Sequence, residues 1–495
     1  MTSPQPPYGP YGSNPTPPPP LSPPPSPAPY VIQPVPPQQP PRSPDGRRKL
    51  IALLVAASLV LVVIVTGGIW LLGSDDGGTD TAKGKDHGTG QGAKAPWSLP
   101  YTQSGRTFAE SVRGVWFTDK AVVKALPDGV AGLDRRDGHR LWGVATPGSD
   151  TVICQASTDA GGNVAILAAG SGRECHHVFA VDIASGRLLW QKELADNRDN
   201  FSIGHTRIAR AQDTVVVSAP RKSTTAFRVS DGTQLWTDAP AVYGGQQCVG
   251  DKYTGGRQLV RIQKCHNGTD TFAPYAVAAV DPVTGKALWT YQLGNALGRE
   301  NSTVVTTDPV VVSVAGSDQR LRMTVLDAGG KVRAALASGD EERPRLSADD
   351  GSTPSPGALV KGGTLYMVAT PTTPHSDGNN KIVAWSLSTG RRLWEQQSTG
   401  LVKAFTIVAS DTPDVLAYSS GNVYDPSALV RFDPATGKQT VVHQYPADPQ
   451  GPRIGPAPLA LLNQDTLYLS SGTTAELADS DQDKRQKALI ALPVK

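Results

Sequence analysis

The chain of 495 residues has only four cysteines and eight histidines, and the histidine spacing does not suggest a catalytic set. It has no glycine loop of the kind that binds phosphate, and it has no G-x-S-x-G nucleophile motif. A strong charge of one sign is also lacking, because the net charge is +3 and the 47 basic residues form no long cluster. These absences give no support to nucleic-acid binding, and no reaction can be read from the sequence.

Proline is distributed unevenly, since 20 of the 43 prolines fall within residues 1–46. That stretch has only two charged residues, Arg42 and Asp45, and few bulky apolar ones. It cannot bury enough apolar surface to offset the chain entropy lost on folding. We therefore expect residues 1–49 to be a disordered, proline-rich tail with a basic end.

One long apolar run is present, at residues 50–72, and it contains no charge. As a helix it would be about 34 Å long, enough to cross a bilayer core of ~30 Å. The basic residues 47–49 precede it and Asp75 and Asp76 follow it, so we expect a type II single-pass protein of the cell membrane with its N-terminus inside. A cleaved signal peptide fits less well, because the preceding tail and the run are long and no A-x-A site follows.

Residues 73–96 hold seven glycines and charges of both signs. Such a segment behaves as a flexible tether, with a root-mean-square reach of roughly 27 Å. We expect it to connect the membrane segment to an extracytoplasmic domain at residues 97–495.

That domain contains an internal repeat: an apolar strand, an Asp, two or three residues, a Gly, a basic or polar residue and then Leu-Trp. Complete copies of the phrase end at Trp142, Trp190, Trp236, Trp289 and Trp394. Two degenerate copies end at Ala334 and near Val441. The copies are 45–60 residues apart, which is typical of four-stranded propeller blades.

The phrase has a simple physical interpretation. The Asp and the Gly four residues later close a tight turn, in which the Gly supplies the positive φ. The Trp follows at a fixed place on the last strand, where a large ring can wedge between neighbouring blades. We therefore assign a structural role to the repeat tryptophans, and we include Trp97 among them.

Two more strand-like runs precede each phrase, so each unit is predicted to hold strands A, B, C and D. The last unit ends at Lys495 without a D strand, and the segment around Trp97 is a strand without a unit. This segment can supply the missing strand, which closes the ring and removes exposed sheet edges. Seven phrases and this composite predict an all-β, eight-bladed β-propeller.

The repeat resembles that of the PQQ-like propeller family, over about 80% of the chain. The family includes quinoprotein dehydrogenases and the propeller lipoprotein of the outer-membrane assembly machinery, so the resemblance implies a fold and not a function. Its alcohol dehydrogenases hold their quinone with two adjacent cysteines, and this chain has none. We therefore expect no PQQ cofactor, no metal and no enzymatic activity, and a PQQ-dependent dehydrogenase is the least favoured alternative.

The four cysteines all follow the membrane segment, where an oxidising compartment permits disulfides. Cys154 and Cys248 each lie 12 residues after a repeat tryptophan, at the start of strand A. Cys175 and Cys265 each follow strand B, which ends beside the start of strand A. Of the three possible pairings, the repeat selects Cys154–Cys175 and Cys248–Cys265.

Two segments resemble a metal site in part, and neither has the full pattern. Cys175 with its neighbours His176 and His177 lacks the paired spacing of a zinc site. Residues 479–490 begin like a calcium loop, with alternating aspartates, but they have Lys and Ile where that loop needs Gly and Glu.

The insertions fall in the B–C and D–A connections, which share one face of a propeller. The most prominent are residues 338–357, 371–381 and 474–487, which are polar. We expect this face to bind a protein or a cell-envelope polymer, so that the chain acts as a membrane-anchored scaffold. One alternative is that the insertions have no binding role and are present because surface loops tolerate them. Another is that the chain is a sensor that signals through the proline-rich tail.

Overall fold

The described part of the chain falls within residues 83–495, the second of the two units into which the chain divides. The computed structural model describes residues 96–494 except 102–111, 113, 149–150, 172–174, 176, 195–205, 219–223, 239–241, 244–245, 267–274, 295–301, 316–320, 338–341, 345–356, 372–379, 399–403, 422–424, 449–451, 455–457 and 473–485. The predicted tail at 1–49, the membrane segment at 50–72 and the tether up to residue 95 lie outside the described residues. Within the described ranges, no helix has both the length and the apolar character to span a bilayer.

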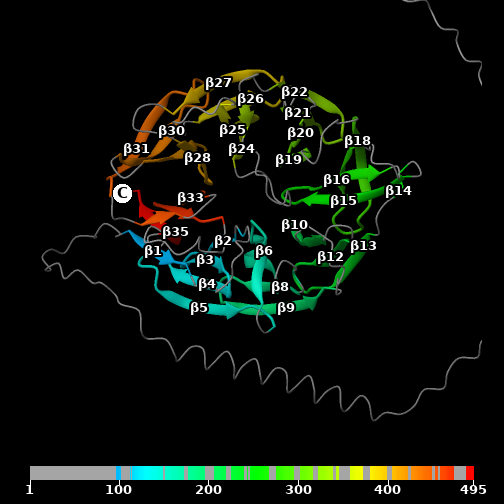
Figure 1. Cartoon of the computed structure of the whole chain (residues 1–495), viewed down its shortest axis with the longest axis horizontal. Helices are drawn as coiled ribbons and strands as arrows, with labels where there is room; N and C mark the ends of the chain where they lie inside the picture. Colours follow the sequence, from blue (N-terminus) through cyan, green and yellow to red (C-terminus); the bar gives the residue numbers. More distant parts are fainter. Residues whose placement is uncertain are drawn as a thin grey trace, which may run out of the picture. The chain divides into compact units, whose positions relative to one another are not determined.

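The described chain is almost entirely β-structure, arranged as antiparallel sets of four strands (Figure 1). Each set is a meander, in which every strand pairs with the next one along the chain. A set is named below by its first and last strands. One set departs from this rule, because its fourth strand, β1, comes from the other end of the domain and pairs with β35.

The first three sets follow one another without additional strands. The β2–β5 set comprises β2 (Val115–Phe117), β3 (Ala121–Leu126), β4 (Gly129–Asp134) and β5 (Arg140–Ala145). The β6–β9 set comprises β6 (Val152–Ala156), β7 (Val164–Gly170), β8 (His177–Asp182) and β9 (Arg187–Glu193), with a 3-10 turn η1 (Gly161–Asn163) before β7. The β10–β13 set comprises β10 (Arg207–Ala211), β11 (Thr214–Ser218), β12 (Thr224–Arg228) and β13 (Gln234–Asp238).

Two of the next three sets carry a short additional strand. The β15–β18 set comprises β15 (Gln246–Thr254), β16 (Leu259–His266), β17 (Tyr275–Val280) and β18 (Ala287–Gly294), and β14 (Val242–Tyr243) pairs with β15. The β19–β22 set comprises β19 (Ser302–Thr307), β20 (Val310–Ala315), β21 (Leu321–Leu326) and β22 (Val332–Ala337). The β24–β27 set comprises β24 (Ala358–Lys361), β25 (Thr364–Pro371), β26 (Lys381–Ser386) and β27 (Arg392–Gln397), and β23 (Glu342–Pro344) pairs with β25.

A nine-stranded sheet contains the last two sets. The β28–β31 set comprises β28 (Ala404–Ala409), β29 (Val415–Ser420), β30 (Ser427–Phe432) and β31 (Gln439–Tyr445). The closing set comprises β33 (Leu459–Asn463), β34 (Thr466–Ser470), β35 (Gln486–Pro493) and β1 (Trp97–Pro100), with β32 (Arg453–Ile454) paired to β35. The two sets are joined by a short parallel pairing of β28 with β33.

The N-terminal strand completes the last set, as the orphan strand in the sequence predicts. β1 pairs antiparallel with β35, and Trp97 lies opposite Ala491. In Figure 1 the sets form a ring, with the first strand of each set toward the middle and the fourth toward the outside. The pairing therefore joins the two ends of the domain and closes the ring.

The core lies between neighbouring sets. All six residues of β3 and all six of β4 are buried, because each of these strands has another set on both of its faces. On the outer strand β5, in contrast, exposed and half-buried residues are mixed. Val123 of the β2–β5 set and Leu167 of the β6–β9 set, for example, share one apolar cluster.

Candidate functional site

The repeat tryptophans lie on the outermost strands, and each indole packs against the turn glycine of the next set. A Cβ placed on Gly437 would lie 2.7 Å from the ring of Trp394, so only glycine leaves room for this contact. The same contact recurs at each of the six predicted tryptophans, in the pairs Trp97–Gly138, Trp142–Gly186, Trp190–Gly232, Trp236–Gly285, Trp289–Gly330 and Trp394–Gly437. These indoles therefore hold neighbouring sets together.

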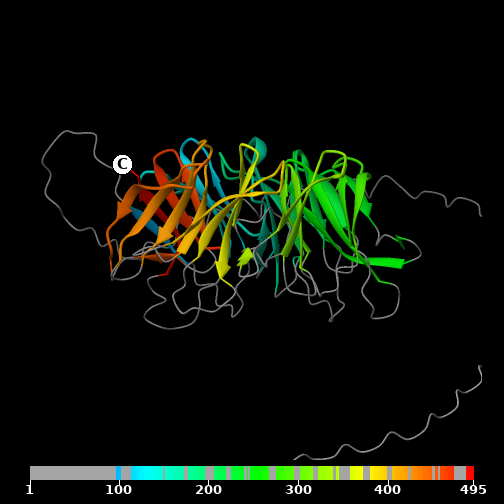
Figure 2. The same cartoon turned by 90° about the horizontal axis from the view of Figure 1, so that it is seen from above.

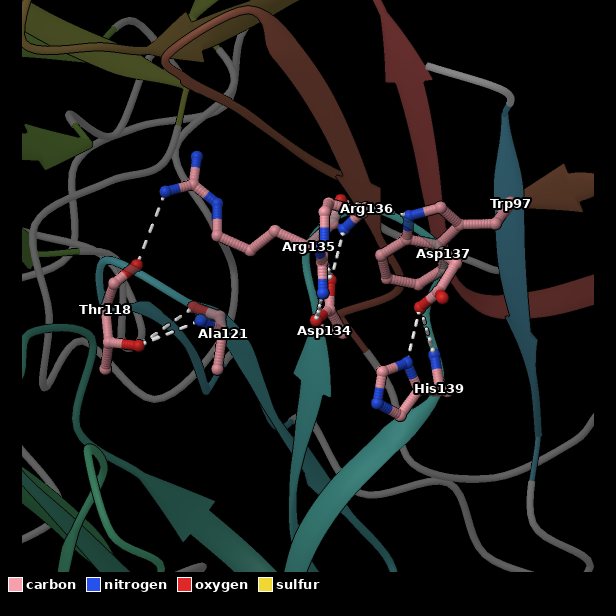
Figure 3. A network of polar contacts seen from close by, with 8 residues as sticks. All are labelled: Trp97, Thr118, Ala121, Asp134, Arg135, Arg136, Asp137 and His139. Carbon is pink, nitrogen blue, oxygen red and sulfur yellow. Dashed lines mark hydrogen bonds and ion pairs between the residues drawn. The ribbon is translucent and has the colours of Figure 1, made fainter. Parts of the chain in front are cut away.

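The indole N–H adds a directional bond to several of these contacts. Trp190 Nε1 donates to the backbone oxygen of Val229 at 2.7 Å, and Trp394 Nε1 donates to that of Pro434 at 2.8 Å. The bond between Trp97 Nε1 and the oxygen of Arg135, at 3.3 Å, extends the pattern across the closure (Figure 3). The N-terminal strand is thus secured by both its strand pairing and the tryptophan contact.

The predicted disulfide between Cys154 and Cys175 is present. It joins β6 to the segment just before β8, and the two Cα atoms are 6.3 Å apart. Both cysteines are buried. A disulfide sulfur is not a thiolate, so Cys175 does not provide a metal ligand to a site with His176 and His177.

Cys248 and Cys265 lie on β15 and β16, and their backbones are direct partners in the antiparallel register. The repeat predicts that Cys265 follows the second strand, whereas the structure places it within β16, still opposite Cys248. The Cys248–Cys265 bond itself stays a prediction, which peptide mapping of the non-reduced protein tests.

Three candidate metal ligands meet in the first tight turn, between β4 and β5 (Figure 3). Ligand atoms of Asp134, Asp137 and His139 lie within 4.8 Å of one another. However, the Asp134 carboxylate is 2.9 Å from the Arg136 guanidinium and accepts a bond from the Arg136 backbone N–H at 2.8 Å. These bonds lower the pKa of Asp134 to about 2. A metal ion would have to displace Arg136, so the arrangement is better explained as a self-bonded turn.

The two faces of the ring differ in construction, and they appear as the upper and lower edges in Figure 2. We call one the turn face, where second and fourth strands begin, and the other the crossing face, where first strands begin and second strands end. On the turn face the third and fourth strands are joined by four to six residues in each of the seven sets that are continuous in sequence. On the crossing face several connections are much longer, for example residues 194–206, 338–357 and 446–458, although residues 127–128 alone join β3 to β4.

All three additional strands lie on the crossing face. β14 pairs with the start of β15, β23 with the end of β25 and β32 with the start of β35. Each belongs to a connection between the fourth strand of one set and the first strand of the next. Of the predicted binding segments, only residues 342–344, 357, 371, 380–381 and 486–487 are among the described residues.

The turn face is instead engaged in contacts between sets. Lys361 of the β24–β27 set donates to the backbone oxygens of Thr412 and Asp414 at 2.5 and 2.7 Å, in the β28–β31 set. Arg210 of β10 donates to the Gly161 oxygen at 2.6 Å and is 3.2 Å from the Asp159 carboxylate. Basic side chains on this face thus satisfy the turn carbonyls of a neighbouring set.

The model of the family described as outer membrane protein assembly factor BamB matches residues 89–257, 208–396 and 275–481. No curated protein matches the sequence.

Solved structures that are similar to this chain include a BamB protein and two dehydrogenases. BamB from Moraxella catarrhalis is 16% identical, with 80% of this chain and 99% of that chain covered and a TM-score of 0.44. Quinohemoprotein alcohol dehydrogenase ADHIIG from Pseudomonas putida HK5 is 13% identical, with 81% and 75% covered and a TM-score of 0.47. A europium-containing methanol dehydrogenase is 14% identical, with 76% and 84% covered and a TM-score of 0.43.

Proposed function

Since this chain belongs to the family described as outer membrane protein assembly factor BamB, we propose that it is a propeller that binds other molecules and catalyses no reaction of its own. We infer that its four-stranded sets are eight blades, with β1 as the last strand of the eighth. We also infer that residues 50–72 anchor it in the cell membrane, with the propeller on the extracytoplasmic side.

The difference between the two faces carries this proposal. In the described part of the chain, the three additional strands and the Cys154–Cys175 disulfide are on the crossing face. Variable segments on a rigid scaffold are where proteins place their binding residues. The turn face has short connections between third and fourth strands, and two of its basic side chains, Arg210 and Lys361, are engaged by neighbouring blades.

The partner that we propose is a protein or a polymer of the cell envelope. The segments 338–357, 371–381 and 474–487 are rich in charged residues, and polar surfaces of this kind form wet, adaptable interfaces. The name of the matching family, an assembly factor, also favours a protein partner.

Affinity capture with the full-length chain in detergent tests the proposal. One variant reverses two charges on β23, as Glu342→Lys with Arg343→Glu. A control variant reverses two charges on the turn face, as Arg391→Glu with Lys438→Glu, which are exposed residues of tight turns. Unlike the first variant, it also makes the net charge more negative, so retained binding in the control excludes a general effect of charge. We expect the first variant to lose envelope partners that the wild type and the control retain. Equal capture by all three proteins would place binding elsewhere.

Protease treatment of intact cells tests the topology separately. We expect the propeller to be degraded while residues 1–46 are protected. A mature soluble form that begins near residue 75 would contradict the membrane anchor.

A further inference from the structure

One buried lysine stands out at the interface where the ring closes. On β3, Val122 and Leu126 belong to the apolar cluster shared with the closing set, and Lys124 lies between them at two-residue spacing. Residues two apart on a strand point to the same side, so Lys124 points into this interface. Only 2% of its surface is exposed.

The corresponding side of the second strand is apolar in the other blades, with one exception. It carries Leu167 on β7, Val217 on β11, Val312 on β20, Met367 on β25, Ala417 on β29 and Leu469 on β34. The propeller fold therefore does not need an amine at this position.

The exception is Arg261 on β16, and its surroundings show how a basic residue is normally accommodated here. Its guanidinium is 2.8 Å from the carboxylate of Asp238, on the outer strand of the preceding blade. Tyr253 donates to the same carboxylate at 3.1 Å. The charge of Arg261 is thus balanced across the interface.

Lys124 has no such carboxylate among the described residues. Its Nζ donates to the backbone oxygen of Ser471, just after β34, at 3.4 Å. Its direct neighbours in register are Val115 on β2 and Ala131 on β4. In the absence of an opposite charge, burial lowers the pKa of Lys124 to about 7.

Among the residues that the structure describes, the other ionisable groups around this interface do not balance the charge either. In the apolar cluster they are the phenols of Tyr468 and Tyr101, and the cluster contains no carboxylate. The nearest charged residue along β35 is Lys487, which has the same sign as Lys124.

We propose that Lys124 is a pH-sensitive latch on ring closure, which favours the closed ring as a neutral amine and weakens it when protonated. An open state, in which β1 and the closing set separate from the first blade, would return Lys124 to water and to its ordinary pKa of about 10.4. The closed ring then binds fewer protons than the open one between the two pKa values. The free energy that favours the closed ring over the open one consequently grows as the pH rises from about 7 to about 10. Below pH 7 the protonation of Lys124 no longer changes this free energy with pH.

Amide hydrogen exchange in β1 and β35 tests the proposal. The full-length wild type and the full-length Lys124→Met variant are compared at each pH. The intrinsic pH dependence of amide exchange is the same in both proteins, so it cancels in the ratio of their rates. Methionine is the residue that β25 carries at the equivalent place. At pH 7 we expect far slower exchange in the variant. The ratio of the two rates should shrink by about tenfold for each pH unit toward pH 10.

The matched control is Lys361→Met. This lysine bridges two blades on the turn face through three oxygen acceptors, so its loss should weaken the structure without producing that pH dependence in β1. Lys124→Leu serves as a second variant, with the residue found on β7 and β34. Equal exchange in wild type and Lys124→Met at every pH, or faster exchange in the variant, would overturn the proposal. Failure of both Lys124 variants to fold would show that the amine is required for folding, and would overturn it as well.

Discussion

Two neighbouring blade interfaces reach the same packing in different ways. Between the β24–β27 and β28–β31 blades, Trp394 packs on Gly437 of the next blade. Between the β19–β22 and β24–β27 blades, Ala334 stands where the tryptophan would be, and the turn glycine Gly390 lies against the backbone oxygen of Ala335. The second interface lacks the repeat indole.

The missing ring is replaced from the opposite side. Trp385, on the third strand of the β24–β27 blade, is 0% exposed and belongs to the same apolar cluster as Ala334. Other blades carry Val181, Phe227 or Phe432 at this place, one position before the first residue of the tight turn. The interface therefore requires a filled volume, and either blade can supply the large side chain.

The largest effect that separates the two interfaces should come from Trp385→Ala. The change opens a large cavity at an interface without a repeat indole, so we expect the free energy of unfolding to fall by about 3–5 kcal/mol. Urea denaturation of the variant and the wild type measures the loss. A loss below about 1 kcal/mol would show that Trp385 is not the replacement for the missing ring.

This replacement could not be foreseen from the sequence. The repeat phrase that ends at Trp394 predicts the turn and the outer strand of its own blade. The degenerate phrase that ends at Ala334 predicts that the packing has a gap where the other blades carry tryptophan. What fills the gap depends on which residue of the next blade faces it, and the inner strands give no periodic signal because both of their faces are buried. Lys124 was missed for the same reason, since a lysine in a run of valines and alanines is ordinarily read as exposed.

Features that rest on the repeat itself were predictable. The closing strand at Trp97 and the Cys154–Cys175 disulfide follow from placing residues in equivalent positions of successive units. The crossing face is also identified by counting strands, because alternate connections of a meander lie on the same side. The inter-blade bonds of Arg210 and Lys361 are not predictable in this way, because they join turns of neighbouring units and depend on how the blades pack.

A smaller effect is expected at the turn glycines, where Gly437→Ala tests the indole contact directly. The φ of Gly437 is +72°, and a Cβ there would lie 2.7 Å from the ring of Trp394. Backbone strain of about 1–2 kcal/mol and displacement of the indole, about 1–3 kcal/mol, should add to roughly 2–5 kcal/mol by the same denaturation measurement.

Gly362→Ala is the matched control for that variant. Gly362 also has a positive φ, +56°, but a Cβ there would meet no atom within 4 Å. Its substitution should therefore show the backbone strain alone, about 1–2 kcal/mol. Equal losses at the two glycines would mean that the indole of Trp394 moves aside without cost.

The smallest difference should appear when the two tryptophans are changed to phenylalanine. Trp394 Nε1 donates to the backbone oxygen of Pro434 at 2.8 Å, whereas Trp385 Nε1 is buried without an acceptor among the described residues. Trp394→Phe removes both ring volume and the hydrogen bond to the Pro434 oxygen, and loss of that bond adds about 1 kcal/mol to the packing loss. Trp385→Phe removes a similar ring volume, but it also removes a buried N–H that has no such acceptor. Loss of this N–H therefore costs no hydrogen-bond energy and can even stabilise the fold. Urea denaturation should thus find Trp394→Phe the more destabilising by about 1 kcal/mol, although Trp385 is the more deeply buried ring. The reverse order would mean that ring volume alone governs both interfaces, and that the indole N–H contributes nothing to holding one blade on the next.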